Sequence, residues 1–366
     1  MSVKQNLSCP VNSHNEWDLL EEVIVGDVDG AMFPDAELIN QYTFPAGEWE
    51  SLKASLGCSG AVPYPEETIE AARICLENFV AILEAEGVHV RRVKKENYTK
   101  AFTSPNWETP SGFCAANPRD PFIIIGDQII ETPMADRSRY FEGWAYRELF
   151  KEYFRAGARW VSAPKPQLLD DLYRKNHQNT VYGEKPHFVV TEFEPVFDAA
   201  DFVRCGRDIF GQKSQVTNQM GIDWLQRHLG DDYCVHTLQS RSPQAMHIDT
   251  TFMPLAPGKV LVNPEFLDID KLPAILKRWE ILIAPKAVQG DYEGMDVISS
   301  WANMNMLMLD EKRVIVEQKQ EPMIKALKNW GFNPIPCSFE NYYPFMGSFH
   351  CATLDIRRRG ELKSYF

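Results

Sequence analysis

A repeated order of short elements constrains the fold of this chain more than any other feature of its 366 residues. Residues 122–125 are an apolar, β-branched run, and a Gly-Asp turn at 126–127 leads into a second such run at 128–131. This pattern predicts a β-hairpin. A helix is expected over 138–156, from a serine N-cap to a glycine stop, and it leads to a short strand at 159–162.

The same order of hairpin, helix and strand recurs along the chain. The further copies, some of them partial, are a hairpin at 304–309 and 314–316 with a helix at 321–330 and a strand at 332–337, a helix at 66–86 with a strand at 88–90, and a strand at 260–262 with a helix near 270–279 and a strand at 281–283. Repetition of one small unit predicts α/β units around a common centre. The competing fold, an open doubly wound sheet, lacks support because no G-x-G-x-x-G motif follows a strand.

The charge balance and the cysteine pattern exclude several classes of protein. With 38 basic and 51 acidic residues, the net charge of −13 lacks the positive footprint of a nucleic-acid binder and disfavours docking on anionic lipid. No apolar run approaches the ~20 residues of a membrane helix and the N-terminus has no signal core, so we expect a soluble, cytoplasmic protein. The eight cysteines form no C-x-x-C pair, which disfavours a zinc ribbon and favours reduced thiols.

Two polar clusters carry side chains that suit nucleophilic and acid/base chemistry. Cys351 lies in a short segment after a glycine, where a thiolate could attack a substrate; the alternative is a small buried apolar residue. His247 and Asp249 are two residues apart, so on a strand they face the same side and could act as an acid/base and a cation anchor. The alternative for His247 is a core histidine with a local hydrogen bond.

Two acidic segments could serve the same cavity. Four carboxylates lie within residues 192–201, and Asp198 among them could orient an imidazole, the alternative being helix capping or surface charge. Asp120 follows an Asn-Pro pair directly before the strand at 122–125 and could bind a cation, the alternative being a turn residue. Spacing alone leaves both alternatives open, and no common metal-ligand spacing is present.

Taken together, these clusters resemble the amidinotransferases, the family of glycine amidinotransferase and its bacterial antibiotic- and toxin-pathway relatives. The resemblance covers nearly the whole chain. Its motifs lie at 9–18, 21–26, 117–120, 130–135, 163–166, 191–201, 206–210, 246–249 (Met-His-Ile-Asp), 307–313, 349–351 (Phe-His-Cys) and 355–360. No single motif would identify the family, whereas so many in order do.

The resemblance implies the pentein fold, an α/β class fold built as a five-bladed propeller with its site at the centre. In that family the cysteine that matches Cys351 is the nucleophile, and the histidine that matches His247 is its acid/base. The aspartate that matches Asp198 orients this histidine. The carboxylates that match Asp120 and Asp249 hold a guanidinium group.

The reaction implied by the resemblance is transfer of the amidino group of L-arginine to an acceptor amine. An amidino group would be carried on Cys351, ornithine would be released, and neither a cofactor nor a metal would be needed. Small molecules are therefore the expected partners. The resemblance also implies a single domain over residues 1–366, and relatives are often homodimers.

Three departures from the family pattern lie at the substrate end of the expected cavity. Gln244 stands in a Gln-Ala pair where glycine-using members have a polar residue and proline. Phe266 stands near the position where arginine-using members commonly have an arginine, and the segment before the cysteine is poorer in glycine than usual. Gln244, Met246 and Ser299 are expected substrate contacts, Ser299 serving the donor's carboxylate. The acceptor stays open among glycine, lysine and a secondary-metabolite amine, with glycine disfavoured.

Two alternative functions stay open on the sequence. A guanidino hydrolase of the same superfamily would let water attack the amidino group on the cysteine, and it would release citrulline or ammonia. A non-catalytic pentein would only bind partners. Retention of Asp198, His247 and Cys351 together argues against the second alternative.

Overall fold

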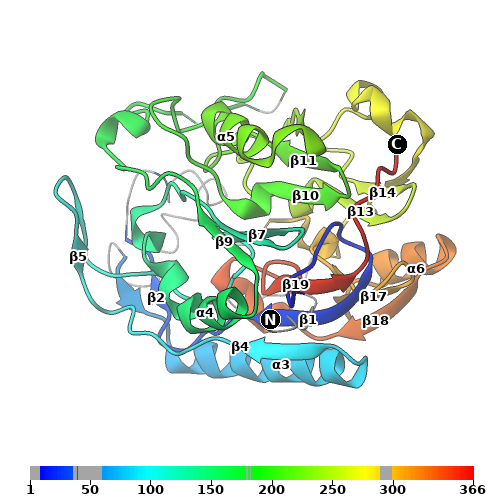
Figure 1. Cartoon of the computed structure of the whole chain (residues 1–366), viewed down its shortest axis with the longest axis horizontal. Coiled ribbons are helices and arrows are strands. Elements are labelled where there is room, and N and C mark those ends of the chain that lie inside the picture. Colours follow the sequence, from blue (N-terminus) through cyan, green and yellow to red (C-terminus); the bar gives the residue numbers. More distant parts are fainter. Residues whose placement is uncertain (1–8, 36–38, 40–59, 179, 182, 289–298) are drawn as a thin grey trace, which may run out of the picture.

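Five three-stranded sheets with one internal order form the framework of the computed structural model, which describes residues 9–35, 39, 60–178, 180–181, 183–288 and 299–366 (Figure 1). In each sheet an antiparallel pair of strands is joined by a third strand that pairs in parallel with the second strand of that pair. In four of the sheets the antiparallel pair is a hairpin, and in the fifth it is formed by β1 and β19 from the two ends of the chain. The sheets are β19 (Thr353–Arg359), β1 (Leu19–Val25) and β4 (His89–Arg92); β7 (Phe122–Ile125), β8 (Gln128–Glu131) and β9 (Arg159–Ser162); β10 (Phe202–Cys205), β11 (Asp208–Gln212) and β12 (Cys234–Leu238); β13 (Phe252–Ala256), β14 (Lys259–Val262) and β15 (Glu280–Ile283); and β16 (Leu307–Met308), β17 (Arg313–Glu317) and β18 (Asn333–Cys337). We call each sheet with its connecting segment a unit, named after its first strand.

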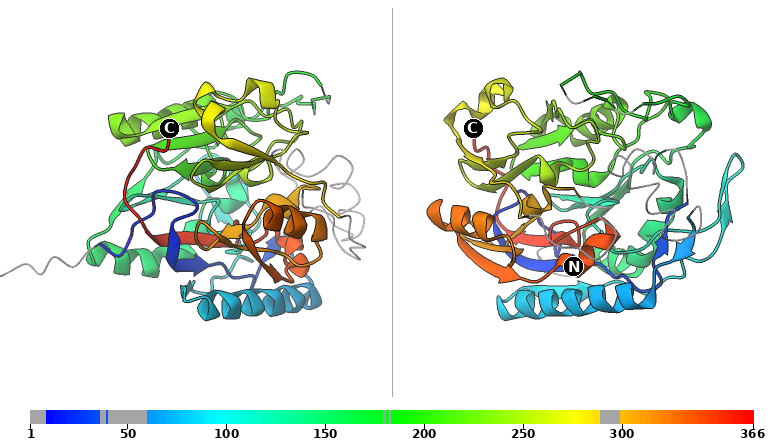
Figure 2. Two further views of the ribbon diagram at one scale, coloured as in Figure 1. Left: turned by 90° about the vertical axis from the view of Figure 1, so that its right-hand side faces the viewer. Right: turned by 180° about the vertical axis from the view of Figure 1, so that it is seen from behind.

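A helix leads to the third strand in four of these units. The helices are α3 (Glu66–Ala85), α4 (Arg147–Arg155), α5 (Gln219–Leu229) and α6 (Glu321–Asn329). Figures 1 and 2 show α3 lying along the outside of the β19 unit. Its buried residues recur at helical spacing, as the sequence predicts, and pack against that sheet. Two short pairs, β2 (Met32–Phe33) with β3 (Val62–Pro63) and β5 (Phe102–Thr103) with β6 (Glu108–Thr109), lie outside the units.

The units follow one another around a ring that both ends of the chain close. The β19 unit joins β1 near the N-terminus to β19 near the C-terminus. Strand β19 contacts β7, β7 contacts the turn before β10, and β10 contacts β13. The ring closes where the backbone N–H of Leu20 donates to the carbonyl of Leu309, over 2.8 Å. The buried segment 11–17 forms backbone bridges with three units, at Gly126, Cys205 and Arg357, and so ties them together.

The predicted hairpin-helix-strand order is confirmed. The hairpin at 122–131 and the strand at 159–162 have the expected bounds, because a β-branched run and a Gly-Asp turn specify them locally. The helix predicted at 66–86 and that predicted at 321–330 are present. The sequence analysis did not assign the β10 unit, whose strands and helix all lie between residues 202 and 238.

One predicted helix is shorter than expected, and another is absent. The segment 138–156 contains two 3-10 turns before α4 begins at Arg147, and Asp136, not Ser138, accepts the capping hydrogen bond. A continuous helix would not leave Arg139 turned inward toward buried carboxylates. Near 270–279 the chain forms two short 3-10 turns around a proline, because proline cannot continue a helix that starts before it.

Two further sequence predictions can be compared with the described residues. No helix there is both long and apolar enough to cross a membrane. The seven described cysteines are free thiols, as predicted, and Cys58 lies outside the described residues.

Candidate active site

Each of the five units supplies a polar side chain from the segment directly before its first strand. Cys351 lies in the turn before β19, Asp120 before β7, Asp198 before β10, His247 before β13 and Asn305 before β16. All five are buried. Because the units form a ring, these five segments, which are far apart in sequence, meet in one place. The geometry of this cluster explains why the sequence motifs occur where they do.

The sulfur of Cys351 lies among an amide and two carboxylates. The Nδ2 of Asn305 donates to Sγ over 2.9 Å, and Sγ–H donates to Oδ2 of Asp249 over 3.1 Å. The same amide nitrogen donates to Asp249 over 2.9 Å. The donor atoms of Cys351, His247 and Asp120 all lie within 4.8 Å of one another. A group bound at this point would touch a nucleophile, an imidazole and a carboxylate at once.

His247 is held between two aspartates. Its Nε2 lies 3.0 Å from Oδ2 of Asp198, and its Nδ1 lies 3.6 Å from Oδ1 of Asp120. The Oδ1 atoms of both aspartates are buried and have no hydrogen-bond partner among the described residues. Unpartnered buried carboxylate oxygens are costly, so they attract a cationic or N–H-rich ligand. The backbone of His247 has φ 58°, a conformation that is rare and strained for a residue with a side chain.

The charges around the site set the proton positions in the ligand-free protein. Burial, and then the charge of Asp249, raise the pKa of the Cys351 thiol to about 12 against the opposing hydrogen bond to His247. Burial alone would lower the pKa of His247, but Asp120 and the hydrogen bond to Asp198 outweigh burial and hold the pKa well above its usual value. At neutral pH the resting pair is therefore a thiol beside an imidazolium.

Arg139 is a site residue that the sequence analysis missed. Its guanidinium donates to both oxygens of Glu142 and, over 2.9 Å, to Oδ2 of Asp120, and it lies 3.8 Å from Asp198. Burial raises the pKa of Glu142 to about 7 despite this pairing. Arg139 thus holds Oδ2 of Asp120 by a hydrogen bond, and Oδ1 of the same carboxylate faces His247. Its position inside a predicted helix gave no signal of this role.

Asn305 was missed for a different reason. It lies in an apolar run that reads as the start of a strand, and asparagine there suggests only a turn. Its Oδ1 accepts from the backbone N–H of His350 over 2.9 Å, so the amide is held with its nitrogen toward Cys351 and Asp249. Its place before β16, equivalent to that of the other four residues, is the signal that could have found it.

Neighbouring residues hold the cysteine segment and Asp249 in place. The Nδ1 of His350 lies 3.3 Å from Asp249, and its Nε2 lies 3.4 Å from Glu16. This contact with His350 lowers the pKa of Asp249, although burial alone would raise it. A side chain at Gly347 would begin 2.2 Å from Oδ1 of Asn117, so only glycine fits where this segment approaches the turn before β7.

Of the three other predicted substrate contacts, Met246 lies beside the cluster, whereas Gln244 and Ser299 are half-buried. Met246 lines a cavity of about 20 Å³ together with Asp198 and Arg139, which is room for about one water molecule. Gln244 is half-buried just before it in the chain. Ser299 is half-buried and its hydroxyl accepts from the backbone N–H of Trp301, which is a turn-capping role. The hydrogen bonds of the Cys351 sulfur are with Asn305 and Asp249, and Ser299 is bonded to Trp301.

The four carboxylates at 192–201 have different roles: two of them cap backbone N–H groups, and Asp198 contacts the imidazole of His247. Glu192 accepts from backbone N–H groups at the start of α5, and Glu194 accepts from two backbone N–H groups at 167–168, so both act as local caps. Asp201 is buried and accepts from Ser214, Thr217 and Gln212. Among the four, Asp198 alone contacts His247 in the described bonds.

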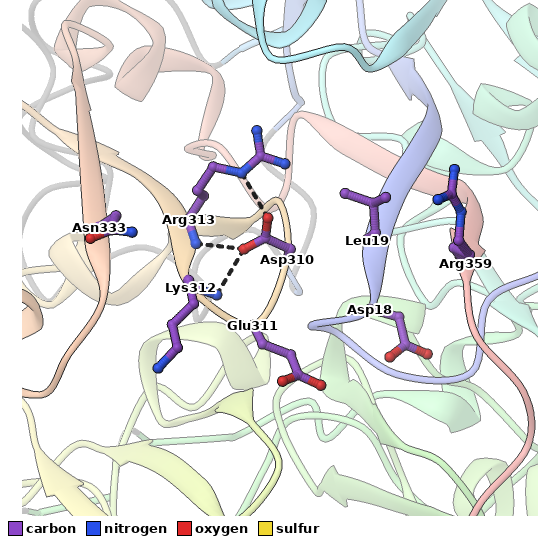
Figure 3. A pocket seen from close by; sticks show the side chains of 8 residues that line it. All are labelled: Asp18, Leu19, Asp310, Glu311, Lys312, Arg313, Asn333 and Arg359. Atoms are coloured by element: carbon purple, nitrogen blue, oxygen red, sulfur yellow. Dashed lines mark hydrogen bonds and ion pairs between the residues drawn. The ribbon is translucent and has the colours of Figure 1, made fainter.

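A larger hollow lies away from this cluster. Figure 3 shows the side chains that line it, from β1, β19 and the turn after β16. Its volume is about 540 Å³. Asp310 there is bonded to Arg313 and to two backbone N–H groups. None of the side chains that line it is a predicted site residue. The buried cluster is therefore the better candidate for the active site.

Known proteins resemble this chain over nearly its whole length, although no protein-family model matches it. An L-arginine:L-lysine amidinotransferase from Pseudomonas savastanoi pv. phaseolicola is 50% identical over 356 residues, 97% of this chain and 96% of that protein. A solved amidinotransferase of the saxitoxin biosynthetic pathway from Microseira wollei is 64% identical, with a TM-score of 0.95, and covers 98% of this chain and 100% of its own. The solved inosamine-phosphate amidinotransferase from Streptomyces griseus is 39% identical, with a TM-score of 0.88, and the match covers 97% of this chain and 99% of that protein. These likenesses confirm the predicted pentein fold.

Proposed function

The chain belongs to the amidinotransferase family, and from that premise we propose that it moves the amidino group of L-arginine to an acceptor amine by way of Cys351. The observation that carries the proposal is the convergence of Cys351, His247 and Asp120, whose donor atoms lie within 4.8 Å of one another. In a protein of this family, a thiol, an imidazole and a guanidinium-binding carboxylate at one point are the parts that the reaction needs.

The donor is held by carboxylates. A guanidinium is a poor electrophile because its charge is delocalised, and a bidentate carboxylate both binds and orients it. The unpartnered Oδ1 of Asp120 and the carboxylate of Asp249, 3.1 Å from the sulfur, support this role. Between them they bring the guanidinium carbon to Sγ of Cys351.

Binding of the cationic donor changes the protonation of the thiol–imidazolium pair. A positive charge near Cys351 favours the thiolate, and the same charge near His247 disfavours a second cation, so the pKa of each group falls. The pair loses one proton and becomes a thiolate beside an imidazolium. The thiolate is the form that can attack carbon.

Two displacements at one carbon then complete the transfer. The sulfur bonds to the guanidinium carbon, the bond from that carbon to Nε of the donor arginine breaks, and His247 gives this nitrogen its proton as it leaves as the δ-amino group of ornithine. The acceptor amine next bonds to the same carbon, His247 takes its proton, and the carbon–sulfur bond breaks. Asp198, bonded to Nε2 over 3.0 Å, keeps the imidazole oriented in both steps. No redox step occurs, so no cofactor is needed.

The acceptor is an amine of an amino acid or of a biosynthetic intermediate. Relatives that match this chain over nearly its whole length are named for lysine, glycine and an inosamine phosphate, so the family accepts amines of different size. The Gln-Ala step before Met246 supports an acceptor other than glycine. Gln244, Met246 and Ser299 are proposed substrate contacts.

A panel of amines with L-arginine as donor tests this function. We expect ornithine release that depends on the added amine, together with one guanidino product per ornithine, measured by amino-acid chromatography and mass spectrometry. The control contains arginine without amine. Steady production of citrulline in that control would show a hydrolase instead, and no release with any amine would contradict the transfer.

Replacement Asp249→Asn is expected to have opposite effects on thiol reactivity and on transfer. Without the donor, alkylation of Cys351 by iodoacetamide at pH 8 should become about tenfold faster, because loss of the carboxylate charge lowers the thiol pKa by roughly one unit. Amidino transfer should fall, since one donor-binding carboxylate is gone. Alkylation is measured by peptide mass spectrometry at Cys351, which separates it from other thiols.

The matched control for this measurement is Asp136→Asn. Asp136 is also a buried aspartate, but its side chain caps the turn at Ser138 and does not contact the sulfur. Its replacement should leave the alkylation rate of Cys351 unchanged. A slower reaction in Asp249→Asn than in the wild type would contradict the electrostatic account.

We also propose that the five units act as one domain over residues 1–366, that the protein is a cytoplasmic homodimer and that it binds no nucleic acid. Support for one domain comes from core clusters that each contain side chains of neighbouring units. The acidic charge of −13 supports the absence of nucleic acid. Light scattering after size exclusion measures the oligomeric state.

A further inference from the structure

A second group of metal-ligand side chains lies in the β10 unit, apart from the candidate active site. Asp208 is the first residue of β11, and Cys234 and His236 lie on the neighbouring strand β12. The two strands are parallel, with Asp208 opposite Cys234 in the register. Residues two apart on a strand face the same side, so Cys234 and His236 project together beside Asp208.

The donor atoms of these residues are close enough to share one ion. One donor atom from each lies within 4.8 Å of the other two, and Nε2 of His236 lies 2.7 Å from Oδ1 of Asp208. Tetrahedral Zn²⁺ with ordinary bond lengths separates its ligand atoms by about 3.3–3.6 Å. The hydrogen bond between His236 and Asp208 would therefore open by less than 1 Å as an ion replaces its proton.

The surroundings suit a bound cation. The side chain of Asp208 pairs with His236 and with no lysine or arginine in the described part of the chain. The ring of Phe210 stacks on that of His236, with centroids 5.1 Å and planes 27° apart, and Nε2 of His236 points toward Asp208. Cys234 is exposed, so an ion can enter from solvent and keep a water in its fourth position.

We propose that Asp208, Cys234 and His236 bind one divalent transition-metal ion of borderline softness, such as Zn²⁺, at the surface of the β10 unit. One thiolate, one imidazole and one carboxylate suit such an ion and do not suit Mg²⁺ or Ca²⁺, which prefer oxygen ligands only. The ion joins the beginnings of β11 and β12. None of the three ligands belongs to the candidate active-site cluster, and β12 is the edge strand of its sheet, so we assign the ion a structural role in holding this edge.

Protons are released when this ion binds. The ligand is the thiolate, so its proton leaves on binding, and affinity should rise with pH. A structural ion also favours the folded state, so the melting temperature should rise with Zn²⁺ concentration.

Zn²⁺ titration against a chromophoric chelator tests the proposal. All proteins carry Cys351→Ser, because the cluster of Asp120, His247 and Cys351 could itself take Zn²⁺. We expect one equivalent to bind in this background. Adding Cys234→Ser or His236→Gln should weaken binding at least about 100-fold, more than the 10–100-fold cost of losing a residue that only supports a ligand. Co²⁺ should show a thiolate charge-transfer band that Cys234→Ser abolishes.

Cys9→Ser added to the same background is the matched control. Cys9 is a partly exposed free thiol outside the cluster, so its removal should change neither the affinity nor the rise in melting temperature. Undiminished one-equivalent binding in the Cys234→Ser protein would overturn the proposal. So would the absence of any binding in the background protein, or equal loss in the Cys9→Ser control. Since exposed Cys234 lies at a strand edge, its serine variant should fold normally, as circular dichroism can verify.

Discussion

Replacing Cys351 with alanine is expected to lower kcat for amidino transfer by roughly 10⁴-fold or more, as loss of a covalent nucleophile does in other enzymes. No other thiol can substitute, because the donor must lie against the carboxylates that surround this sulfur. The fold should survive, since the alanine leaves a cavity of about one sulfur atom. Initial rates of ornithine release give the measurement.

A trapping experiment separates this role from simple loss of structure. Wild-type protein mixed with arginine alone and quenched in acid should carry one amidino group on the peptide that contains Cys351, detected by mass spectrometry. The matched control is Cys75→Ala, which removes another buried free thiol, on α3 and in the core. It should keep near-normal kcat. Normal turnover by a folded Cys351→Ala protein would exclude the covalent mechanism.

Replacing Asp355 with asparagine is expected to destabilise the fold by about 3–5 kcal/mol, the usual cost of leaving buried charge uncompensated. Asp355 is fully buried on β19, and its two oxygens accept from three arginines. These contacts are with Arg119 at 2.7 Å, Arg204 at 2.9 Å and Arg358 at 2.8 Å. Because these arginines come from different units, loss of the carboxylate sets buried positive charges against one another at the junction.

The effect of acid follows from the same cluster. Burial opposes ionisation, but Arg119 and the other two arginines outweigh it and hold the pKa of Asp355 far below its ordinary value; Arg204 does the same for Glu16. A depressed folded-state pKa contributes stability that is present above the unfolded pKa of about 4 and is lost as pH falls below it. The wild-type free energy of unfolding should therefore fall below pH 4, and less steeply in Asp355→Asn.

Chemical denaturation at pH 7 and at pH 3 measures both effects. Asp232→Asn is the matched control, because Asp232 is also paired with an arginine but its side chain is 79% exposed. Its replacement should change the unfolding free energy by no more than ~0.5 kcal/mol. If Asp355→Asn unfolds within ~1 kcal/mol of the wild type at pH 7, the buried charge cluster does not hold the units together.

Strands and hairpins were predictable from the sequence where both the strand residues and the turn residues between them were typical of a hairpin. The hairpin at 122–131 has a β-branched run on each side of a Gly-Asp turn, and the structure has the predicted bounds. The segment after it reads as one helix, yet Arg139 turns inward to bond Glu142 and Asp120, and this buried pairing outweighs helical propensity. Periodicity does not report such long-range contacts.

The candidate site shows the same division. The residue types that stand out in sequence, Cys351, His247 and Asp198, meet in the structure, and their roles stay a prediction until tested. Asn305 escaped notice because an amide has no titration or nucleophilicity to mark it, although its nitrogen lies 2.9 Å from the sulfur. Arg139 lies within the helix predicted at 138–156, and an arginine at such a position carries no sequence signal of a buried contact.

The sequence by itself determined the repeating unit and the polar side chain that stands before the first strand of most units, because hairpin turns and strand runs are set by neighbouring residues. Only the tertiary structure decided which atoms meet and which protons they hold. Asp120 and Cys351 are more than 200 positions apart, and the contact of β19 with β7 in the ring brings them together. Their charges then act on one another at short range in a buried place, where solvent cannot screen them.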